Sequence, residues 1–178
     1  MSTALLTDHY ELTMVDAARK SGRGDRGAVF EVFARHLPPG RRYGVVAGTA
    51  RLLDAIAEFR FGPQELTFLK ANAIVSSETL DWLESYRFSG TIRGYAEGDL
   101  YFPGSPILSV EGEFQEAVVL ETLILSVLNY DTAVASAASR MVQAADSRPL
   151  IEMGARRASE RSAVAAARAA YIAGFDAT

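Results

Sequence analysis

Residues 149–178 narrow the choice of fold more than any other part of the sequence. Residues 149–154 (PLIEMG) have the length and apolar content of a buried strand, Ser159 can cap a helix over 161–173, and Gly174 suits a left-handed helix end before a second run at 175–178. A helix that joins two strands of one sheet places them in parallel, and parallel strands need neighbouring strands and covering helices. We therefore expect these 178 residues to be the N-terminal portion of a longer α/β protein.

The first half of the sequence alternates between helix and strand patterns. Asp8 and Glu11 form a capping-box pattern ahead of a helix that places Tyr10 and Met14 on one face. Runs rich in β-branched and aromatic residues predict two strands, and cap residues or proline predict three further helices. The strands are expected at 27–35 and 43–47, and the helices are expected to begin at Thr49, at Pro63 and at Ser76 or Ser77.

The second half contains a glycine-punctuated stretch and then two apolar helices. Residues 88–112 alternate in hydropathy and predict a small antiparallel β subdomain. Helices are expected at 115–128 and 132–145, with a joint at 129–131. We therefore predict an α/β domain over residues 1–128, followed over 129–178 by a linking helix and the start of a second domain.

Composition excludes several classes of function. The chain has no cysteine and two histidines, so it has no disulfide, thiolate metal site or cysteine nucleophile. Its net charge of −4 gives no basic field that would attract nucleic acid. Its first residues show neither a basic n-region nor a long apolar run, and no uninterrupted apolar stretch reaches about 18 residues, so we expect no membrane partner and a cytoplasmic location.

Two neighbouring arginines follow the strand pattern at 149–154. Arg156 and Arg157 stand where a strand passes into a helix, and in α/β barrels ligands bind at this end of the strands. A guanidinium offers a bidentate fork to carboxylate or phosphate, and the free amides of the next helix add positive potential. The residues therefore indicate either a site for an anionic substrate or a solvated or ion-paired couple.

Five segments together resemble the nicotinate phosphoribosyltransferases. In family order they are 5–14 (LLTDHYELTM), 30–38 (FEVFARHLP), 121–130 (ETLILSVLNY), 152–158 (EMGARRA) and 174–178 (GFDAT). The resemblance spans the whole chain.

This resemblance implies an activity and an architecture. Members couple nicotinate to 5-phosphoribosyl 1-pyrophosphate, with ATP hydrolysis and Mg²⁺, and form dimers whose active sites use both subunits. The implied fold is of the type II phosphoribosyltransferase kind, an N-terminal α/β hammerhead-like domain followed by an irregular α/β barrel, truncated here after its first βα unit. The family's phosphorylated histidine is expected downstream, so this chain holds no catalytic residue and no metal ligand, and alone is expected to be inactive.

The resemblance also assigns individual residues. Tyr10 matches the tyrosine that reaches the nicotinate ring from the neighbouring subunit, although it could instead pack its own helix against the core. Arg156 matches the first arginine of the family's Gly-x-Arg-Arg motif, and Arg157 is the weaker second one. Asp176 and Thr178 fall in a loop beside the barrel mouth and are expected to support the residues that touch substrate.

The sequence also allows other interpretations of its histidines and of its function. His9 is more typical of a solvated helix start, and neither it nor His36 is assigned to catalysis. A related phosphoribosyltransferase acting on nicotinamide or quinolinate would share the two-domain plan. A non-catalytic dimerisation module of the same fold is the alternative from a different class.

Overall fold

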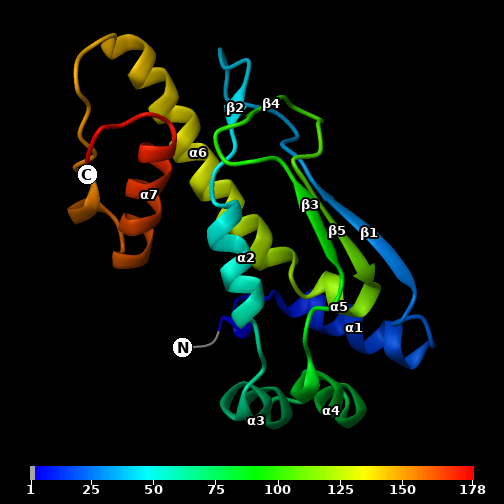
Figure 1. Cartoon of the computed structure of the whole chain (residues 1–178). Helices are drawn as coiled ribbons and strands as arrows, with labels where there is room; N and C mark the ends of the chain where they lie inside the picture. Colours follow the sequence, from blue (N-terminus) through cyan, green and yellow to red (C-terminus); the bar gives the residue numbers. More distant parts are fainter. Residues whose placement is uncertain (1–2) are drawn as a thin grey trace. The chain divides into compact units, whose positions relative to one another are not determined.

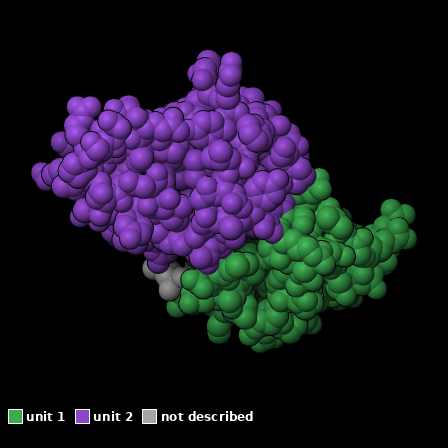
Figure 2. All heavy atoms as spheres, turned by 45° about the horizontal axis from the view of Figure 1, so that its top comes forward, with its two compact units in different colours: residues 1–31, 52–93, 109–125 green, residues 32–51, 94–108, 126–178 purple. Residues whose placement is uncertain are grey.

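The computed structural model describes residues 3–178, which divide into two compact units (Figures 1 and 2). Unit 1 comprises residues 1–31, 52–93 and 109–125, of which residues 1 and 2 lie outside the described part, and unit 2 comprises 32–51, 94–108 and 126–178. Each unit is therefore assembled from segments that are distant in the sequence. The predicted boundary between residues 128 and 129 concerns domains of the longer protein and stays a prediction.

Unit 1 contains mostly short helices around an apolar core. They are η1 (Ala4–Leu6), α1 (His9–Lys20), most of α2 (Thr49–Glu58), α3 (Pro63–Ala71), α4 (Ser77–Ser85), α5 (Phe114–Val118) and the first turn of α6 (Glu121–Ala145). Phe59, Phe61 and Tyr86 pack edge to face with ring centroids 5.6–5.9 Å apart. The helix starts predicted at Thr49, Pro63 and Ser76–Ser77 are confirmed.

Within residues 3–178, five strands form two small sheets. One sheet has the order β1 (Gly27–Val32), β5 (Leu108–Glu113), β3 (Thr91–Gly94). In unit 2, β2 (Gly44–Val45) pairs antiparallel with β4 (Leu100–Tyr101), and Gly44 lies opposite Tyr101. A Cβ at Gly44 would lie 2.2 Å from the Tyr101 ring, so this pairing requires glycine. Of the strands in the predicted β subdomain, β3 and β5 pair with each other, and β5 and β4 also pair with β1 and β2, which come from earlier in the chain.

A buried carboxylate fixes the start of α1. The predicted capping box forms, because the Asp8 amide donates to Glu11 Oε2 at 3.2 Å. Glu11 is 0% exposed and also accepts hydrogen bonds from the Thr7 hydroxyl and from the amide and hydroxyl of Thr122, the latter two at 3.1 and 2.6 Å. Burial raises the pKa of Glu11 even though these hydrogen bonds favour the carboxylate. Glu11 therefore ties α1 to the first turn of α6.

A second carboxylate, Asp16, ties α1 to α4 and should make unit 1 sensitive to acid. Burial alone would raise its pKa, but hydrogen bonds from Lys20, Ser76 and Thr79 outweigh burial and hold the pKa well below its usual range. A lowered folded-state pKa gives stability that is present above the unfolded pKa of about 3.9 and is lost as the pH falls. We expect Asp16→Asn to cost about 1–3 kcal/mol of unfolding free energy at pH 7 and much less at pH 3.

Thermal melts at the two pH values check this expectation. Asp54→Asn, at an exposed position on α2, is the matched control. An Asp16→Asn destabilisation that is equal at pH 7 and pH 3 would contradict the assigned role.

The expected joint at 129–131 is wrong, because α6 runs without a break from Glu121 to Ala145. The chain breaks instead between α5 and α6, at residues 119–120. Two of the three polar residues that suggested a joint have side-chain partners within unit 2. Asp131 pairs with Arg51, and the Tyr130 hydroxyl donates to the Ser162 carbonyl at 3.3 Å. Such partners lie far away in the sequence and cannot be read from a local pattern.

The helix and the parallel connection predicted at the C-terminal end form, but the two expected strands are reduced to a single parallel bridge. Ile151 makes a parallel bridge to Ala177, and α7 (Glu160–Ile172) lies between them in sequence and ends ahead of Gly174, whose φ is +107°. Figure 1 shows α7 beside α6, and Ala138 of α6 packs with Ala170 of α7 and Phe175. The expectation of a buried strand is wrong for this chain, since Ile151 is 58% and Met153 71% exposed.

Among the helices of residues 3–178, none combines the length and the apolar character that crossing a bilayer demands.

Candidate functional site

The two predicted arginines lie on a short exposed turn in unit 2. Arg156 and Arg157 belong to the 3₁₀ turn η2 (Ala155–Arg157), after the Ile151 bridge and before α7. The Arg157 amide donates to the Gly154 carbonyl at 2.8 Å, which holds the turn. Within residues 3–178 neither guanidinium has a hydrogen bond or an ion pair, and both side chains are exposed. Two positive charges without intramolecular partners are suited to an anionic ligand.

A polar cavity of about 290 Å³ lies at the N-terminal end of α7. Its polar lining residues are Arg51, Ser126, Tyr130, Arg161 and Ser162, and Arg156 and Arg157 do not line it. Arg161 stands in the first turn of α7, where unpaired backbone amides add positive potential. We name this cavity the α7 pocket. Its lining is basic and hydroxylated, as an anion site requires.

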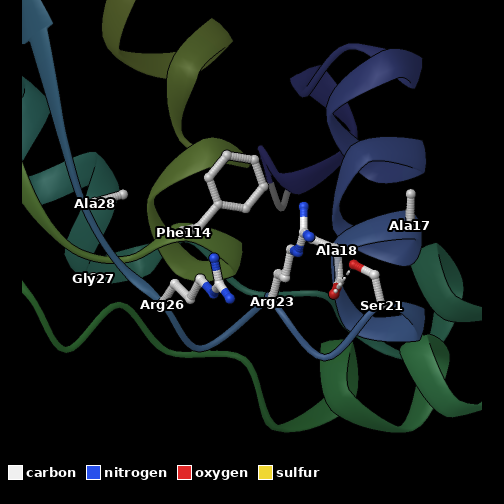
Figure 3. A pocket seen from close by; sticks show the side chains of 8 residues that line it. All are labelled: Ala17, Ala18, Ser21, Arg23, Arg26, Gly27, Ala28 and Phe114. Carbon is white, nitrogen blue, oxygen red and sulfur yellow. Dashed lines mark hydrogen bonds between the residues drawn. The ribbon is translucent and has the colours of Figure 1, made fainter.

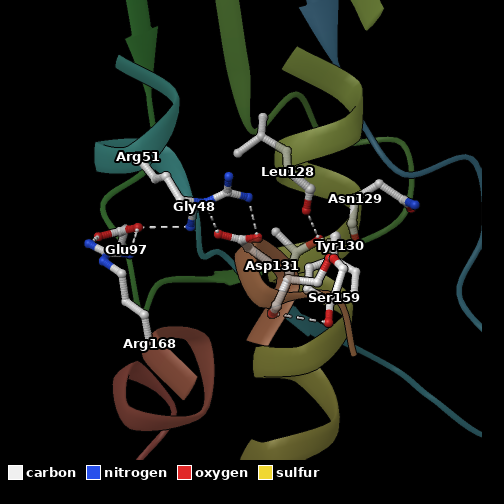
Figure 4. A network of polar contacts seen from close by, with 11 residues as sticks. Gly48, Arg51, Glu97, Leu128, Asn129, Tyr130, Asp131, Ser159 and Arg168 are labelled. Carbon is white, nitrogen blue, oxygen red and sulfur yellow. Dashed lines mark hydrogen bonds and ion pairs between the residues drawn. The ribbon is translucent and has the colours of Figure 1, made fainter. Parts of the chain in front are cut away.

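A network of two ion pairs supports this region (Figure 4). Arg51 donates to both carboxylate oxygens of Asp131 at 3.2 and 2.8 Å, and the Asp131 side chain is 1% exposed. Arg168 of α7 donates to both oxygens of Glu97 at 2.6 Å, and the Gly48 amide donates to Glu97 at 2.8 Å. Hydrogen bonds from Arg168 lower the pKa of Glu97 despite its partial burial. The network therefore fixes α7 and the Gly48 turn within unit 2.

Gly48 should tolerate no side chain. Its φ is +95°, and a Cβ would lie 2.8 Å from Asp131 Oδ2. We expect Gly48→Ala to cost about 2–3 kcal/mol, because it adds backbone strain and displaces the carboxylate that holds Arg51. The matched control is Gly98→Ala, where φ is +93° and nothing lies within 4 Å of the added Cβ. Equal losses of unfolding free energy in the two variants, measured by urea denaturation, would show that the contact with Asp131 has no effect.

A second basic cavity in unit 2 has a volume of about 390 Å³. Arg35, His36 and Arg41 contribute its basic side chains, and Phe33 and Tyr101 contribute aromatic rings. The remaining lining residues are Ala34, Leu37, Pro38, Asn129, Thr132, Ala133 and Ser136. We name it the strand-end pocket, because its basic residues follow β1. No acidic side chain lines it, so it too can accept an anion.

Tyr10 lies in unit 1, on the first turn of α1, and is 46% exposed. Desolvation together with a hydrogen bond to the Glu121 carboxylate and nearby acidic charges raises the pKa of Tyr10 to about 12. The phenol therefore stays protonated at neutral pH. Tyr10 and Met14 form the exposed face of α1, whereas Glu11, Leu12 and Val15 form its buried face.

The other residues singled out in the sequence have structural contacts or are exposed. Asp176 uses its carboxylate to accept the Leu150 amide at 2.8 Å, while its own amide donates to the Leu150 carbonyl at 3.0 Å. Thr178 and His9 are exposed. His36 lines the strand-end pocket.

Sequence reasoning missed the ion-pair network and the strand-end pocket. Glu97 and Arg168, like Arg51 and Asp131, meet only through the tertiary fold. The strand-end pocket did have a sequence signal, since Arg35, His36 and Arg41 surround the turn that ends the first predicted strand.

The described residues contain no cluster of metal-ligating side chains. Within residues 3–178 no three histidine or carboxylate side chains come together as ligands. No step of the chemistry is therefore assigned to a metal held by this chain.

The fold is that of the type II phosphoribosyltransferases. The crystal structure of human nicotinic acid phosphoribosyltransferase matches with a TM-score of 0.88 and 31% identity, over 96% of this chain and 35% of that one. A nicotinate-nucleotide pyrophosphorylase from Pyrococcus furiosus matches with a TM-score of 0.73 at 22% identity, over 98% of this chain and 37% of that one, a likeness of fold alone. The predicted fold class is confirmed.

The family model described as the nicotinate phosphoribosyltransferase N-terminal domain matches residues 5–129. Nicotinate phosphoribosyltransferase pncB1 of Mycobacterium tuberculosis is 62% identical over 174 residues, which cover 98% of this chain and 38% of that protein. The chain belongs to the nicotinate phosphoribosyltransferase family. It spans less than two-fifths of the length of this relative.

Proposed function

We propose that the whole protein joins nicotinate to 5-phosphoribosyl 1-pyrophosphate, giving nicotinate mononucleotide and pyrophosphate for NAD salvage. The observation that carries the proposal is the close identity of nearly the whole chain to a mycobacterial protein named for this reaction. The geometry supports an anionic substrate class, because Arg156 and Arg157 are exposed without a partner in residues 3–178. Both proposed substrates are anions.

Arg156 is proposed to grip the nicotinate carboxylate or a phosphate of the second substrate through its bidentate fork, with Arg157 as the weaker second contact. Tyr10 is proposed to reach the active site of a neighbouring subunit and to stack its exposed ring on the pyridine there. Its raised pKa keeps the hydroxyl protonated, so Tyr10 is proposed to offer the ring face and not to exchange a proton. Asp176 and Thr178 are proposed to support the residues that touch substrate without contacting substrate themselves.

The strand-end pocket and the α7 pocket are proposed to hold phosphate groups. Arg35, His36 and Arg41 line the strand-end pocket. Arg161 lines the α7 pocket beside Arg51, whose charge is already paired with Asp131, so Arg161 is the cation proposed to meet phosphate there. Pyrophosphate carries several negative charges, so a binding surface with positively charged side chains suits it.

The reaction breaks the bond between ribose C1 and the pyrophosphate oxygen and forms a bond from C1 to the pyridine nitrogen. The bond electrons leave with pyrophosphate, and positive charge develops on the sugar in the transition state. The chain's own task is to hold two anions in line and to offset charge on the leaving group. Mg²⁺ and ATP are proposed as co-substrates of the whole protein, with ATP acting through a histidine downstream of residue 178.

A homodimer with shared active sites is also proposed. Leu6, Tyr10 and Met14 are large apolar side chains exposed near the start of unit 1, and a cluster of this kind is typical of an interaction surface. Light scattering of the whole protein tests the mass, and Met14→Glu should shift it toward the monomer. A monomeric wild type would contradict the dimer.

Initial-rate assays of the whole protein with nicotinate, nicotinamide and quinolinate test the reaction. We expect nicotinate to be used with the highest kcat/KM, and preference for another pyridine would support a related phosphoribosyltransferase. No turnover of any of the three would support the non-catalytic dimerisation module. The 178 residues alone are expected to form no nicotinate mononucleotide, and product formation by them would overturn that expectation. The cytoplasmic location stays a prediction, which fractionation of cells tests.

A further inference from the structure

Unit 1 contains a cavity of about 360 Å³ between the end of α1 and the start of β1 (Figure 3). This volume lies at the lower end of the range for small-molecule sites, roughly 300–1,000 Å³. Small side chains line it, from Ala17 and Ala18 on α1 and from Gly27 and Ala28 on β1, and the Phe114 ring adds an aromatic surface. We name it the α1–β1 pocket. Its walls are mostly hydrocarbon.

The Phe114 ring and the turn that carries the cations are held in place. Phe114 packs on Phe30 with ring centroids 6.0 Å apart, and its amide donates to the Arg26 carbonyl at 2.8 Å. The Arg23 amide donates to the Ala18 carbonyl at 2.8 Å. The backbone at both arginines is therefore fixed relative to the apolar walls.

Two guanidinium groups at this pocket have no partner within residues 3–178. Arg23 and Arg26 both line the cavity, and Figure 3 shows both side chains extending from the turn on the side where Phe114 lies. In the part of the chain described, residues 3–178, neither has a hydrogen bond or an ion pair for its guanidinium. Arg19, by contrast, donates to Gln115 at 2.7 Å and stacks over Trp82. The unpartnered pair gives the pocket a positive mouth and an apolar interior.

We propose that the α1–β1 pocket binds a small aromatic carboxylate. The ring would pack between the alanine methyl groups and Phe114, and the carboxylate would accept hydrogen bonds from Arg23 and Arg26. A free phosphate would pair with Arg23 and Arg26 but would leave the apolar walls of the pocket in contact with water. A neutral aromatic molecule would cover the walls but would leave the two guanidinium groups without a partner. This site lies in unit 1 and does not depend on the proposed reaction.

Benzoate is the probe, titrated into the whole protein by isothermal titration calorimetry, with benzamide and inorganic phosphate as comparison ligands. We expect benzoate to bind about ten-fold more tightly than either comparison ligand, because each lacks one half of the recognition. Arg26→Gln should weaken benzoate about ten-fold, and the double variant Arg23→Gln/Arg26→Gln more. Ala17→Leu, at an exposed helical position where leucine is well tolerated, should abolish binding by filling the cavity.

Nicotinate is itself an aromatic carboxylate, so the two sites are separated by variants. Arg26→Gln should leave kcat/KM for nicotinate unchanged, and Arg156→Gln should leave benzoate binding at the α1–β1 pocket unchanged. Arg42→Gln, an exposed arginine that lines none of the described pockets, is the charge control. No benzoate binding, equal affinity for phosphate, or binding lost only with Arg156→Gln would each overturn the proposal. Absence of turnover with benzoate binding intact would count against the proposed function alone.

Discussion

Replacing Arg156 by glutamine in the whole protein is expected to lower kcat/KM for nicotinate by about 100-fold. Arg156 is exposed on the turn after Ile151 and has no partner within residues 3–178, so its charge is available to a substrate. A hydrogen bond between charged groups contributes about 1.5–3 kcal/mol, and a bidentate pair has two of them. Initial rates of nicotinate mononucleotide formation measure the effect.

Three further variants test whether the effect comes from the guanidinium group of Arg156. Arg156→Lys keeps the charge but loses the fork, so it should recover only part of the activity. Arg157→Gln should have a smaller effect than Arg156→Gln, and Arg42→Gln should have none. If Arg156→Gln leaves both kcat and KM unchanged, the arginine is a solvated surface residue.

Truncating Glu11 to alanine is expected to lower the free energy of unfolding by about 3–5 kcal/mol. The carboxylate is fully buried and accepts hydrogen bonds from Thr7, Asp8 and Thr122, so its removal leaves two backbone amides without a buried acceptor. Urea denaturation followed by circular dichroism measures the loss. Glu84→Ala, at an exposed position on α4, should change stability by less than about 0.5 kcal/mol.

The pH dependence of this contribution has a definite sign. Burial raises the pKa of Glu11, so its stabilising effect is greatest below the unfolded pKa of about 4.3 and declines as the pH rises through the folded-state value. Glu11→Gln, which cannot ionise, should flatten this part of the stability profile. A profile that is steeper in Glu11→Gln than in the wild type would contradict the assignment.

Local signals in the sequence predicted local features correctly. Asp8 and Glu11 gave the start of α1, and Gly174, with a φ of +107°, gave the end of α7. The parallel pairing of Ile151 with Ala177 also followed from the order of elements. Each of these depends on residues that are close in sequence or on a general rule of connection.

Features that depend on distant partners could not be predicted in the same way. The polar run 129–131 predicts a joint, because nothing nearby in the sequence offers Asp131 a partner inside a helix. The structure supplies that partner in Arg51, far upstream, and the helix continues through the run. Glu11 was predicted as a cap, but its burial against Thr122 depends on how α6 packs. For the candidate site, the arginine pair could be found from sequence. The basic residues of the strand-end pocket are also close in sequence, but the fold is needed to show that Tyr101 and Thr132 close a pocket around them.

The Asp176 carboxylate accepts the Leu150 amide beside the parallel bridge between Ile151 and Ala177, so it helps to set the alignment of the two segments. Side chains alternate between the two faces of an extended segment, so a shift of one residue would exchange the side chains on the two faces. One exposed aspartate thus contributes to the choice of which side chains on either side of the bridge share a face.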